Sequence, residues 1–328
     1  MRCLILSRMA SLYATKRLAE EGRKLGTKVS IIDTLRLSVL VSEDGGKIFY
    51  KNSEIKHPDI VIPRIGASIT AFGGCIMTQM EQMNIPMLNS SLGMFNSRDK
   101  FRSSQILASN GIPIPKTLVL RKPSKKDVAE NDSLKRRILL KEKITNSISY
   151  LGGVPVIIKL NKGTQGIGVT LCNNLNEVYA QIDLLWKTKE DFLIQEFIKN
   201  SKGIDIRAMV VGNEVVASMK RESKTDFRSN THQGGEVSRF ELDEETKKIA
   251  VKAAKSLGLN VAGVDMLIGK NDYKVIEVNS SPGFEGLEKA TKKNVAGRIM
   301  KYALTLTHKY NGNINVPDKI NGTQLYVM

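Results

Sequence analysis

The sequence is poor in the residues that most often build zinc sites, disulfide frameworks and base-stacking platforms. Its three cysteines, Cys3, Cys75 and Cys172, and its three histidines are scattered, and none of them form a pair at metal-ligand spacing. Any metal is therefore expected to be a hard cation bound by oxygen ligands. Aromatic residues make up only 5% of the chain, so stacking platforms for single-stranded nucleic acid are not favoured.

Long hydrophobic runs are also missing. A membrane-spanning helix needs about 20 apolar residues in succession, and no stretch of the sequence approaches that length. The apolar start of the chain is strand-length and is followed by Ser7 and Arg8, which is too short for a signal peptide. With 41% hydrophobic residues the chain has enough material for real cores, and we expect a cytoplasmic protein.

Basic residues are in large excess. The formal net charge is +17, which favours polyanionic partners such as nucleic acid, nucleotides or acidic peptides. Because aromatic residues are few, phosphates and carboxylates fit this charge at least as well as bases. A solvated basic surface is the alternative for most of the lysines.

Strand and helix signals alternate along the first ninety residues. Apolar runs of strand length alternate with helical spacing, which predicts βαβ units and a parallel sheet with helices on its faces. The expected strands are Cys3–Leu6, Val29–Asp33, Asp59–Ile62 and Ile85–Leu88, and the expected helices are Leu12–Leu25 and Ile69–Met83.

The rest of the chain mixes helices with β-rich segments. The run of strands at Phe192–Ile198, Ile204–Val211 and Glu214–Lys220 predicts one antiparallel sheet, followed by a polar loop from Arg221 to Ser238. Other expected strands are Lys116–Leu120, Val154–Leu160, Val169–Cys172, Val261–Ile268 and Tyr273–Asn279. Expected helices are Asp99–Asn110, Leu175–Trp186, Glu244–Leu257 and about Leu287–Lys309, and the segment 121–150 is basic with helical spacing.

A lysine and a glycine-rich turn form the first candidate site. Lys159 ends a strand, and the sequence GTQGIG begins at Gly163. Glycines let backbone N–H groups approach phosphate oxygens, and the lysine adds a full positive charge. A hairpin turn with a solvated lysine is an equally good interpretation of this segment alone.

Two acids and an amide form the sharpest cluster. Glu277 and Asn279 are two residues apart and share one face of a strand, and the hairpin-like spacing lets Asp265 lie opposite Glu277. Unpaired buried carboxylates are costly, so simple burial does not explain this pattern. Oxygen ligands that also approach ATP phosphates are typical of a magnesium site, whereas a hydrogen-bonded polar cluster is the alternative.

Three further positions have binding chemistry. Glu196 lies between apolar residues and could reach an adenine amino group, although an ordinary exposed glutamate is the better interpretation in isolation. Arg207 could contact a transferred phosphoryl group because its planar fork matches phosphate geometry. The segment 226–235 has the composition of a lid over an anionic site, in which His232 fits a binding or positioning role.

Taken in order, these motifs resemble the ATP-grasp ligases, and more narrowly the RimK-type α-L-glutamate ligases. The resemblance rests on Lys159 with GTQGIG, QEFI, the DIR of residues 205–207, DFRSNTHQGG, the GVD ending at Asp265 and EVNSSPG, and it covers about residues 1–309. The segments 62–66 and 98–100 match as well. The order of six motifs makes chance agreement very unlikely, although each motif alone is weak.

The resemblance implies an α/β (α+β) ATP-grasp fold in three lobes. These are a pre-ATP-grasp domain at 1–95, a central lobe at 96–190 and a C-terminal lobe at 191–310, with ATP between the last two and a flexible tail at 311–328. By the same resemblance, Lys100, Lys159, Gly163, Gln165, Gly166, Gly168, Glu196, Phe197, Asp205, Arg228, Ser229 and Asn230 would bind ATP. Arg207 and Arg228 would be catalytic, and Asp265, Glu277 and Asn279 would bind two Mg²⁺ or Mn²⁺ ions.

The implied reaction joins L-glutamate to an acceptor that already ends in glutamate, through an acyl-phosphate, with release of ADP and phosphate. The acceptor would be an acidic peptide or the C-terminus of a ribosomal protein, read by Arg64 and, less clearly, by Arg8 and His232. The expected reaction requires neither nucleic acid nor a membrane, and a homo-oligomer is possible. The alternatives are a related ligase acting on a small coenzyme or carrier protein, an inactive nucleotide-binding regulator, and a nucleic-acid-binding protein.

Two features depart from the family pattern. The segment 121–150 is longer and more basic than expected, which leaves its role open. Phe197 stands where tyrosine is common, a change that a backbone contact to adenine would tolerate.

Overall fold

The computed structural model describes residues 1–121, 133–163, 167–223, 236–270 and 272–312. The chain divides into two compact units. Unit 1 comprises Met1–Arg64, Ile76–Leu88 and Ala296–Met328, and unit 2 comprises Ile65–Cys75 and Asn89–Val295. No helix in the described ranges is long and apolar enough to cross a membrane.

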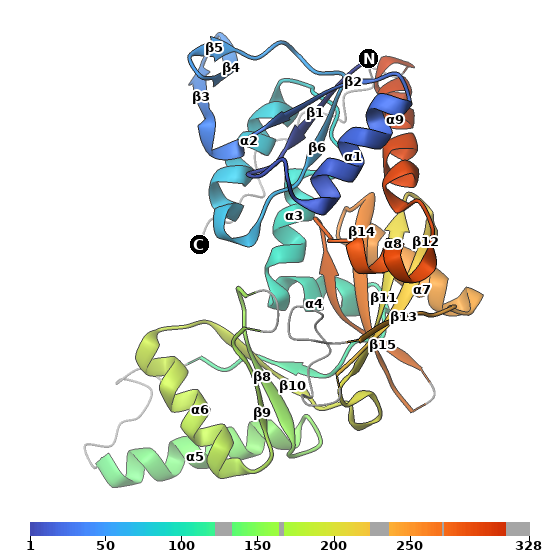
Figure 1. Ribbon diagram of the computed structural model, residues 1–328. Coiled ribbons are helices and arrows are strands. Elements are labelled where there is room, and N and C mark those ends of the chain that lie inside the picture. Colours follow the sequence, from blue (N-terminus) through green and yellow to red (C-terminus); the bar gives the residue numbers. More distant parts are fainter. Residues whose placement is uncertain (122–132, 164–166, 224–235, 271, 313–328) are drawn as a thin grey trace. The chain divides into compact units, whose positions relative to one another are not determined.

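Unit 1 is built on a three-stranded parallel sheet in the order β2-β1-β6, drawn in blue in Figure 1. Its strands are β1 (Arg2–Leu6), β2 (Lys28–Ile32) and β6 (Ile60–Pro63), and a separate antiparallel sheet contains β3 (Leu37–Ser42), β4 (Gly45–Tyr50) and β5 (Ser53–Glu54). The helices are α1 (Tyr13–Lys24), most of α2 (Thr70–Gln82) and nearly all of α9 (Val295–Gly312). The predicted parallel βαβ arrangement is confirmed for three of the four expected strands, whereas Ile85–Leu88 contributes only an isolated bridge between Met87 and Val61.

Helix α1 packs closely against β2 and α9. A Cβ atom added at Gly22 would lie 2.7 Å from a methyl carbon of Val29 and 2.8 Å from the terminal methyl of Met300. The glycine therefore lets the helix approach both neighbours, and Leu18 is buried on the same helix.

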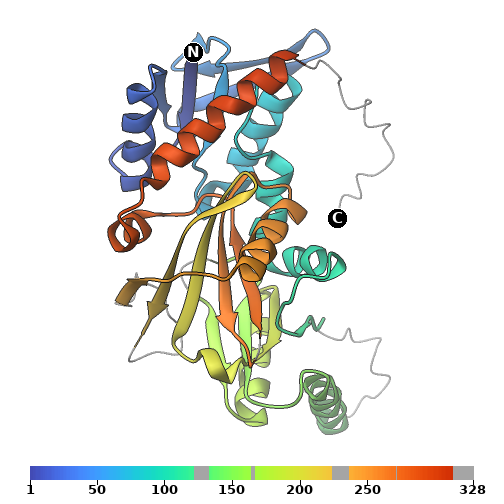
Figure 2. The ribbon, with the colours of Figure 1, turned by 90° about the vertical axis from the view of Figure 1, so that its right-hand side faces the viewer.

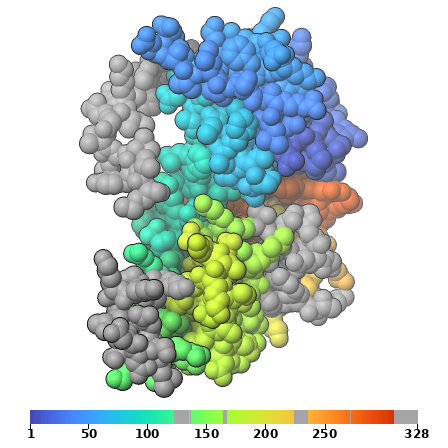
Figure 3. Space-filling model, turned by 90° about the vertical axis from the view of Figure 1, so that its left-hand side faces the viewer, coloured from blue at the N-terminus to red at the C-terminus, as the bar shows by residue number. Residues whose placement is uncertain are grey.

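One sheet of unit 2 is four-stranded, in the order β7-β10-β8-β9. Its strands are β7 (Thr117–Leu118), β8 (Val156–Leu160), β9 (Val169–Cys172) and β10 (Phe192–Glu196), with α5 (Ser133–Ser149) and α6 (Leu175–Thr188) beside them. Apolar residues of both helices and of β8 and β10 share one core, which contains Ile144, Ile158 and Ile182. The lime-coloured surface in Figure 3 belongs to this part of the chain. Leu184 of α6 is exposed.

The other sheet of unit 2 is five-stranded and antiparallel, in the order β13-β12-β11-β14-β15. Its strands are β11 (Ile204–Val211), β12 (Glu214–Glu222), β13 (Glu236–Arg239), β14 (Val261–Ile268) and β15 (Tyr273–Asn279). The helices of this part are α3 (Ser91–Arg98), α4 (Lys100–Ser109), α7 (Glu244–Ser256) and α8 (Glu285–Thr291).

Alternation along these strands separates an apolar face from a polar one. Ile206 and Ala208 of β11 are buried with Val264 of β14 and Ala250 of α7 in one core of unit 2, and Figure 2 shows α7 against this sheet. Successive strand residues point to opposite faces, so Asp205 and Arg207 face away from that core. The polar motifs gather on this second face.

Several sequence predictions need correction. The strand at Phe192 was predicted to join the sheet of Ile204–Val211, but it pairs with β8 and β7 instead. The predicted final helix is two helices, since the backbone turns left-handed at Lys292 between α8 and α9. The polar loop was predicted to begin at Arg221, whereas β12 continues to Glu222 and β13 begins at Glu236.

Within the basic segment 121–150, residues 133–149 form α5 as their helical spacing indicated. The predicted division into three lobes remains a prediction. The tail from 313 onward lies outside the described residues.

Candidate active site

The polar face of the five-stranded sheet carries a row of paired residues. Cross-strand register places Asp205 opposite Arg221, Arg207 opposite Asp265, and Asp265 opposite Glu277. Asn279, two residues after Glu277, lies opposite Gly263. The predicted pairing of Asp265 with Glu277 is therefore confirmed, and two arginines extend the row onto β11 and β12.

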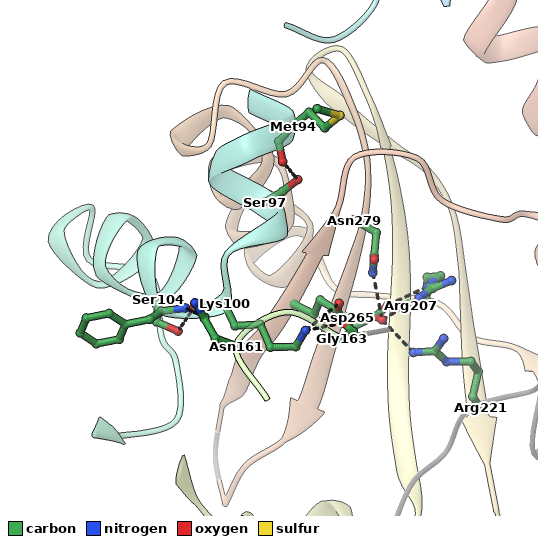
Figure 4. Close-up of polar contacts among 12 residues, drawn as sticks. Met94, Ser97, Lys100, Ser104, Asn161, Gly163, Arg207, Arg221, Asp265 and Asn279 are labelled. Atoms are coloured by element: carbon green, nitrogen blue, oxygen red, sulfur yellow. Dashed lines mark hydrogen bonds and ion pairs between the residues drawn. The ribbon is translucent and has the colours of Figure 1, made fainter. Parts of the chain in front are cut away.

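Asp265 is at the centre of this row, as Figure 4 shows. Its Oδ1 accepts a hydrogen bond of 2.7 Å from Arg207 Nε, and its Oδ2 accepts one of 2.6 Å from Arg207 Nη2. Arg221 Nη2 lies 3.0 Å from the same Oδ2. Asn279 Nδ2 lies 3.5 Å from it, at the limit of hydrogen bonding.

Arg221 also binds Asp205 through two of its guanidinium nitrogens. Its Nε and Nη2 each donate to the Asp205 carboxylate at 2.6 Å. The side chains of both residues are at least 95% buried. Two arginines thus share two aspartates in the interior of the sheet, so the cluster is neutral without any added ion.

The neighbouring charges favour the ionised forms of Asp265 and Arg221. Burial alone would raise the pKa of Asp265, but Arg207 and Arg221 outweigh it and hold that pKa below its usual range. Burial alone would lower the pKa of Arg221, yet Asp265 and Asp205 raise it overall. The paired arginines therefore make a buried, charged aspartate tolerable at neutral pH.

Two lysines and Glu277 form the more open part of the site. Lys100 Nζ donates to the carbonyl oxygen of Gly163 at 2.6 Å and lies 4.0 Å from Glu277 Oε1. Lys159 is on β8, and its pKa is lowered to about 8, mainly by burial. The negative charge of Glu277 raises this pKa, and the positive charge of Lys100 lowers it further. The strand, the glycine turn and the first residue of α4 thus bring two cations to one carboxylate.

Local hydrogen bonds explain how Lys100 and the turn are held together. Asn161, directly after β8, accepts from the backbone N–H of Phe101 at 3.0 Å and donates to Asp99 Oδ2 at 3.0 Å. Asp99 in turn caps α4 by accepting from the backbone N–H of Arg102. Gly168 closes the turn with a φ of +72°, which L side chains rarely adopt.

A small open hollow lies beside Glu277. Its lining is mostly polar and consists of Ser97, Arg98, Lys100, Gly163, Glu277, Val278, Asn279 and Ser280. Arg98 Nη2 donates to the carbonyl oxygen of Ile65 at 2.6 Å, whereas Arg98 Nε and Ser280 Oγ find no hydrogen-bond partner among the described residues.

The oxygen donors of this face fit a hard cation. The described residues contain no group of three histidine, cysteine, aspartate or glutamate side chains that could hold a metal ion. The predicted ligands Asp265, Glu277 and Asn279 therefore remain a prediction, and a cation at them would need further ligands from a bound nucleotide. Magnesium is usually bound in that way, by one or two carboxylates together with substrate phosphates. Glu277 has about a third of its side chain exposed, which leaves its carboxylate accessible.

Other predicted residues occupy different surroundings. Glu196 Oε1 accepts from the backbone N–H of Lys116 at 3.1 Å and lies 3.8 Å from Lys274 Nζ, and Phe197 follows it directly after β10. Asp205, predicted to hold ribose hydroxyls, is engaged by Arg221, so a ribose contact would have to share its oxygens.

The predicted acceptor-binding arginines belong to unit 1. Arg64 and Arg8 follow the carboxyl ends of the parallel strands β6 and β1, and the backbone N–H of Arg64 donates to Leu6. Gln165, Gly166, Arg228, Ser229, Asn230 and His232 lie outside the described residues, and their roles remain predictions.

Arg221 was missed by sequence reasoning. The run Lys220-Arg221-Glu222 has no apolar alternation, so the predicted strand ends two residues too early, at Lys220. The signal that could have found it is the register, because extending β12 by two residues brings Arg221 opposite Asp205. Arg98 was noted only as part of a motif, and its burial beside the hollow was not predicted.

Solved structures identify the fold as that of the ATP-grasp ligases. The ATP-grasp ligase PsnB with its minimal precursor, Mg and ADP is 20% identical with a TM-score of 0.68, over 94% of this chain and 98% of that chain. The D-alanine–D-alanine ligase of Bacillus anthracis, complexed with ATP, is 18% identical with a TM-score of 0.61, over 94% and 98% of the two chains.

The family follows from the sequence. Residues 1–94 match the RimK pre-ATP-grasp domain, and residues 97–303 match the RimK-like ATP-grasp domain. Proteins named probable alpha-L-glutamate ligase from Rhodopirellula baltica and Vibrio vulnificus are 44% and 42% identical over 92% of this chain, covering 70% and 95% of their own lengths. The chain belongs to the RimK family of ATP-grasp ligases, which are ADP-forming enzymes.

Proposed function

We propose that this enzyme adds L-glutamate to the carboxylate of an acceptor that ends in glutamate. The observation that carries the proposal is the row of charged residues Arg207, Asp265 and Glu277 on adjacent strands of the sheet, with Lys100 beside Glu277. That row holds oxygen donors and cations together in one site, as ATP-dependent ligation requires. The glutamate specificity is supported by the names of relatives that share more than two-fifths of the aligned residues.

The proposed chemistry has two steps. An acceptor carboxylate oxygen attacks the γ-phosphorus of ATP, the bond from that phosphorus to the bridging oxygen breaks, and ADP leaves. The amine of glutamate then attacks the acyl carbon, loses a proton, and displaces phosphate as the peptide bond forms. Lys100 and Lys159 would hold the phosphate oxygens, where a unit charge pair about 4 Å apart contributes about 4 kcal/mol at an effective dielectric near 20.

The metal would be Mg²⁺ or Mn²⁺, with two ions per site. Glu277, Asn279 and Asp265 would hold the ions, whose charge would offset the negative charge on the phosphates. The complex of PsnB with Mg and ADP supports this use of metal. Arg207 would then act next to the transferred phosphoryl group, from the position that its two bonds to Asp265 fix.

The acceptor would be an acidic peptide or the C-terminus of a ribosomal protein. Each added glutamate makes such a product more anionic, and a protein of net charge +17 attracts it. Arg64 and Arg8, beyond the ends of β6 and β1, would contact acceptor carboxylates. Three free cysteines among the described residues agree with a reducing compartment, so we place the reaction in the cytoplasm.

The function is tested by incubating the purified chain with ATP, Mg²⁺, single amino acids and peptides ending in glutamate or glutamine. We expect ADP release with glutamate and products spaced by one glutamyl unit, preferentially on peptides ending in glutamate. If lysine or alanine were ligated far better, the glutamate assignment would be wrong while the family assignment stood. Release of AMP instead of ADP would contradict the acyl-phosphate route.

A second experiment tests the acceptor site. Arg64→Ala should raise the acceptor KM more than the ATP KM, and the rate advantage of acidic acceptors should shrink as salt screens the charges. Arg36→Ala is a matched control, because Arg36 is an exposed arginine of unit 1 with only a 3.8 Å ion pair to Asp33. Equal changes in both variants would show that Arg64 acts only through general charge.

A further inference from the structure

Arg221 connects two aspartates that the ligase would use for different parts of its nucleotide. Its Nε and Nη2 hold Asp205 at 2.6 Å, and the same Nη2 lies 3.0 Å from Asp265 Oδ2. Only 3% of the Arg221 side chain is exposed. An arginine so buried acts on the site through its neighbours and cannot contact a substrate directly.

The two carboxylate oxygens of Asp265 have unequal numbers of contacts. Oδ2 accepts from Arg207 Nη2 and lies within reach of Arg221 Nη2 and Asn279 Nδ2, at 2.6, 3.0 and 3.5 Å. Oδ1 accepts only the 2.7 Å bond from Arg207 Nε among the described residues. A carboxylate oxygen offers about two lone-pair directions, so the contacts to Oδ2 fill it, whereas Oδ1 has one direction without a hydrogen-bond partner among the described residues.

We propose that Arg221 is a positioning residue that saturates Asp265 Oδ2 and so presents Oδ1 to the cation. Asp205 anchors the guanidinium from the other side, which fixes the orientation of its Nη2. Arg207 already holds both oxygens in a bidentate pair, and Arg221 adds a second donor to Oδ2 that Arg207 cannot supply. The inference rests on the proposed function insofar as it requires a cation at Asp265.

Arginine suits this task better than lysine. Its planar fork can make two parallel bonds to Asp205 and still direct a donor toward Asp265, whereas a single ammonium group cannot reproduce that geometry. Removing a partner that orients a metal ligand typically lowers metal affinity by about 10- to 100-fold. A purely structural ion pair would instead change the stability of the free protein without a selective effect on the metal.

The experiment compares wild type with Arg221→Lys, which keeps the charge, and with Arg239→Lys as a control. Arg239 is also on the five-stranded sheet, but it is more than half exposed and paired with Glu241. Melting temperatures are measured without ligand, with ADP, and with ADP plus Mg²⁺. The Mg²⁺ concentration for half-maximal ADP release is measured separately at saturating ATP.

We expect Arg221→Lys to retain the stabilisation by ADP alone, to lose the additional stabilisation by Mg²⁺, and to need about 10- to 100-fold more Mg²⁺ for activity. Arg239→Lys should match wild type. If Arg221→Lys kept the full Mg²⁺-dependent shift and the wild-type Mg²⁺ requirement, the proposal would be overturned.

Failure of the proposed function gives a different result. A wild-type protein that gains stability from Mg²⁺ with ADP but ligates no glutamate would contradict the substrate and leave the role of Arg221 intact. A wild-type protein whose melting temperature does not rise when Mg²⁺ is added to ADP would contradict both the proposed function and the role of Arg221.

A measurement on the wild-type protein covers the case in which Arg221→Lys does not fold. With ¹⁵N-labelled arginine, Mn²⁺ added with ADP should broaden the Nε–H signals of Arg207 and Arg221 and leave that of Arg239 sharp. Signals of Arg207 and Arg221 that stay as sharp as that of Arg239 would show that no cation binds beside Asp265, which would overturn the proposal.

Discussion

Substituting Asp265 by asparagine tests the physical basis of the site without any substrate. The change keeps the shape of the side chain but removes the charge that Arg207 and Arg221 share. Asp205 would remain as the only carboxylate within the buried cluster, beside two arginines. We therefore expect Asp265→Asn to destabilise the metal-free protein markedly.

The expected loss of stability follows from the burial of Asp265 and Arg221. Asp265 and Arg221 have 4% and 3% of their side chains exposed, so solvent screens the lost charge poorly. Removing one partner of a buried ion pair costs about 3–5 kcal/mol, and much of that is the cost of leaving the other charge unpaired. Asparagine can still accept one hydrogen bond, which places the expected loss near the lower end of that range.

The effect should depend on pH in a defined direction. The arginines hold the pKa of Asp265 below its unfolded value, so its contribution is present above the unfolded pKa, about 4, and is lost as the pH falls through the lower folded value. Urea unfolding of unit 2 at neutral and at acidic pH measures this contribution. The difference between wild type and Asp265→Asn should shrink toward acidic pH.

Glu241→Gln provides the control. Glu241 accepts from Arg239 at 2.6 Å in an exposed pair on the same part of the chain, and we expect its loss to leave the unfolding midpoint unchanged. If Asp265→Asn lowered stability no more than Glu241→Gln did, the buried cluster would not stabilise the sheet as argued.

Three other predictions follow from the site and its surroundings. Glu277→Gln should abolish ligation while far-ultraviolet circular dichroism and the unfolding midpoint stay close to wild type, since Glu277 is partly exposed. Lys159→Ala should weaken ATP binding in calorimetry, and wild-type affinity should fall above the Lys159 pKa of about 8. A thiol reagent should label exposed Cys75 first, because Cys3 and Cys172 are buried with pKa values raised by burial to about 12 and 11.

Each of these has a contrary outcome. Near-normal turnover in Glu277→Gln would remove it from the proposed metal site. Unchanged ATP affinity and turnover in Lys159→Ala would make that lysine a structural residue only. Labelling of Cys3 at the rate of Cys75 in the native protein would show that β1 opens readily.

The sequence predicted the strands of the site well because their patterns are local. The ranges Ile204–Val211, Val261–Ile268 and Tyr273–Asn279 agree with β11, β14 and β15 at both ends. Each is a β-branched apolar run between turn residues, and the acids in it stand out for that reason. Spacing alone then sufficed to place Asp265 opposite Glu277.

Pairing between distant segments could not be predicted in the same way. The strand at Phe192 has the same pattern as its neighbours, and only its partners decide that it joins β8 rather than β11. Arg221 is buried because Asp205 and Asp265 neutralise it, and a charged run offers no hydrophobic signal of burial. The break at Lys292 depends on a left-handed backbone that lysine rarely adopts.

The arrangement of charges explains how one sheet can hold an acid cluster and still attract anions. Arg207 and Arg221 balance Asp205 and Asp265 inside the sheet, so this cluster contributes little net field outside it. The charge of the remaining part of the site then comes from Glu277 and two lysines, so positive charge is in excess there. A nucleotide with several negative charges, or a nucleotide together with a metal, balances this excess. A bare divalent cation would be repelled by two lysines and attracted by Glu277 alone in this part of the site. We therefore expect metal binding to be much stronger with nucleotide than without it, and titration calorimetry with Mg²⁺ alone and with ADP present measures that difference.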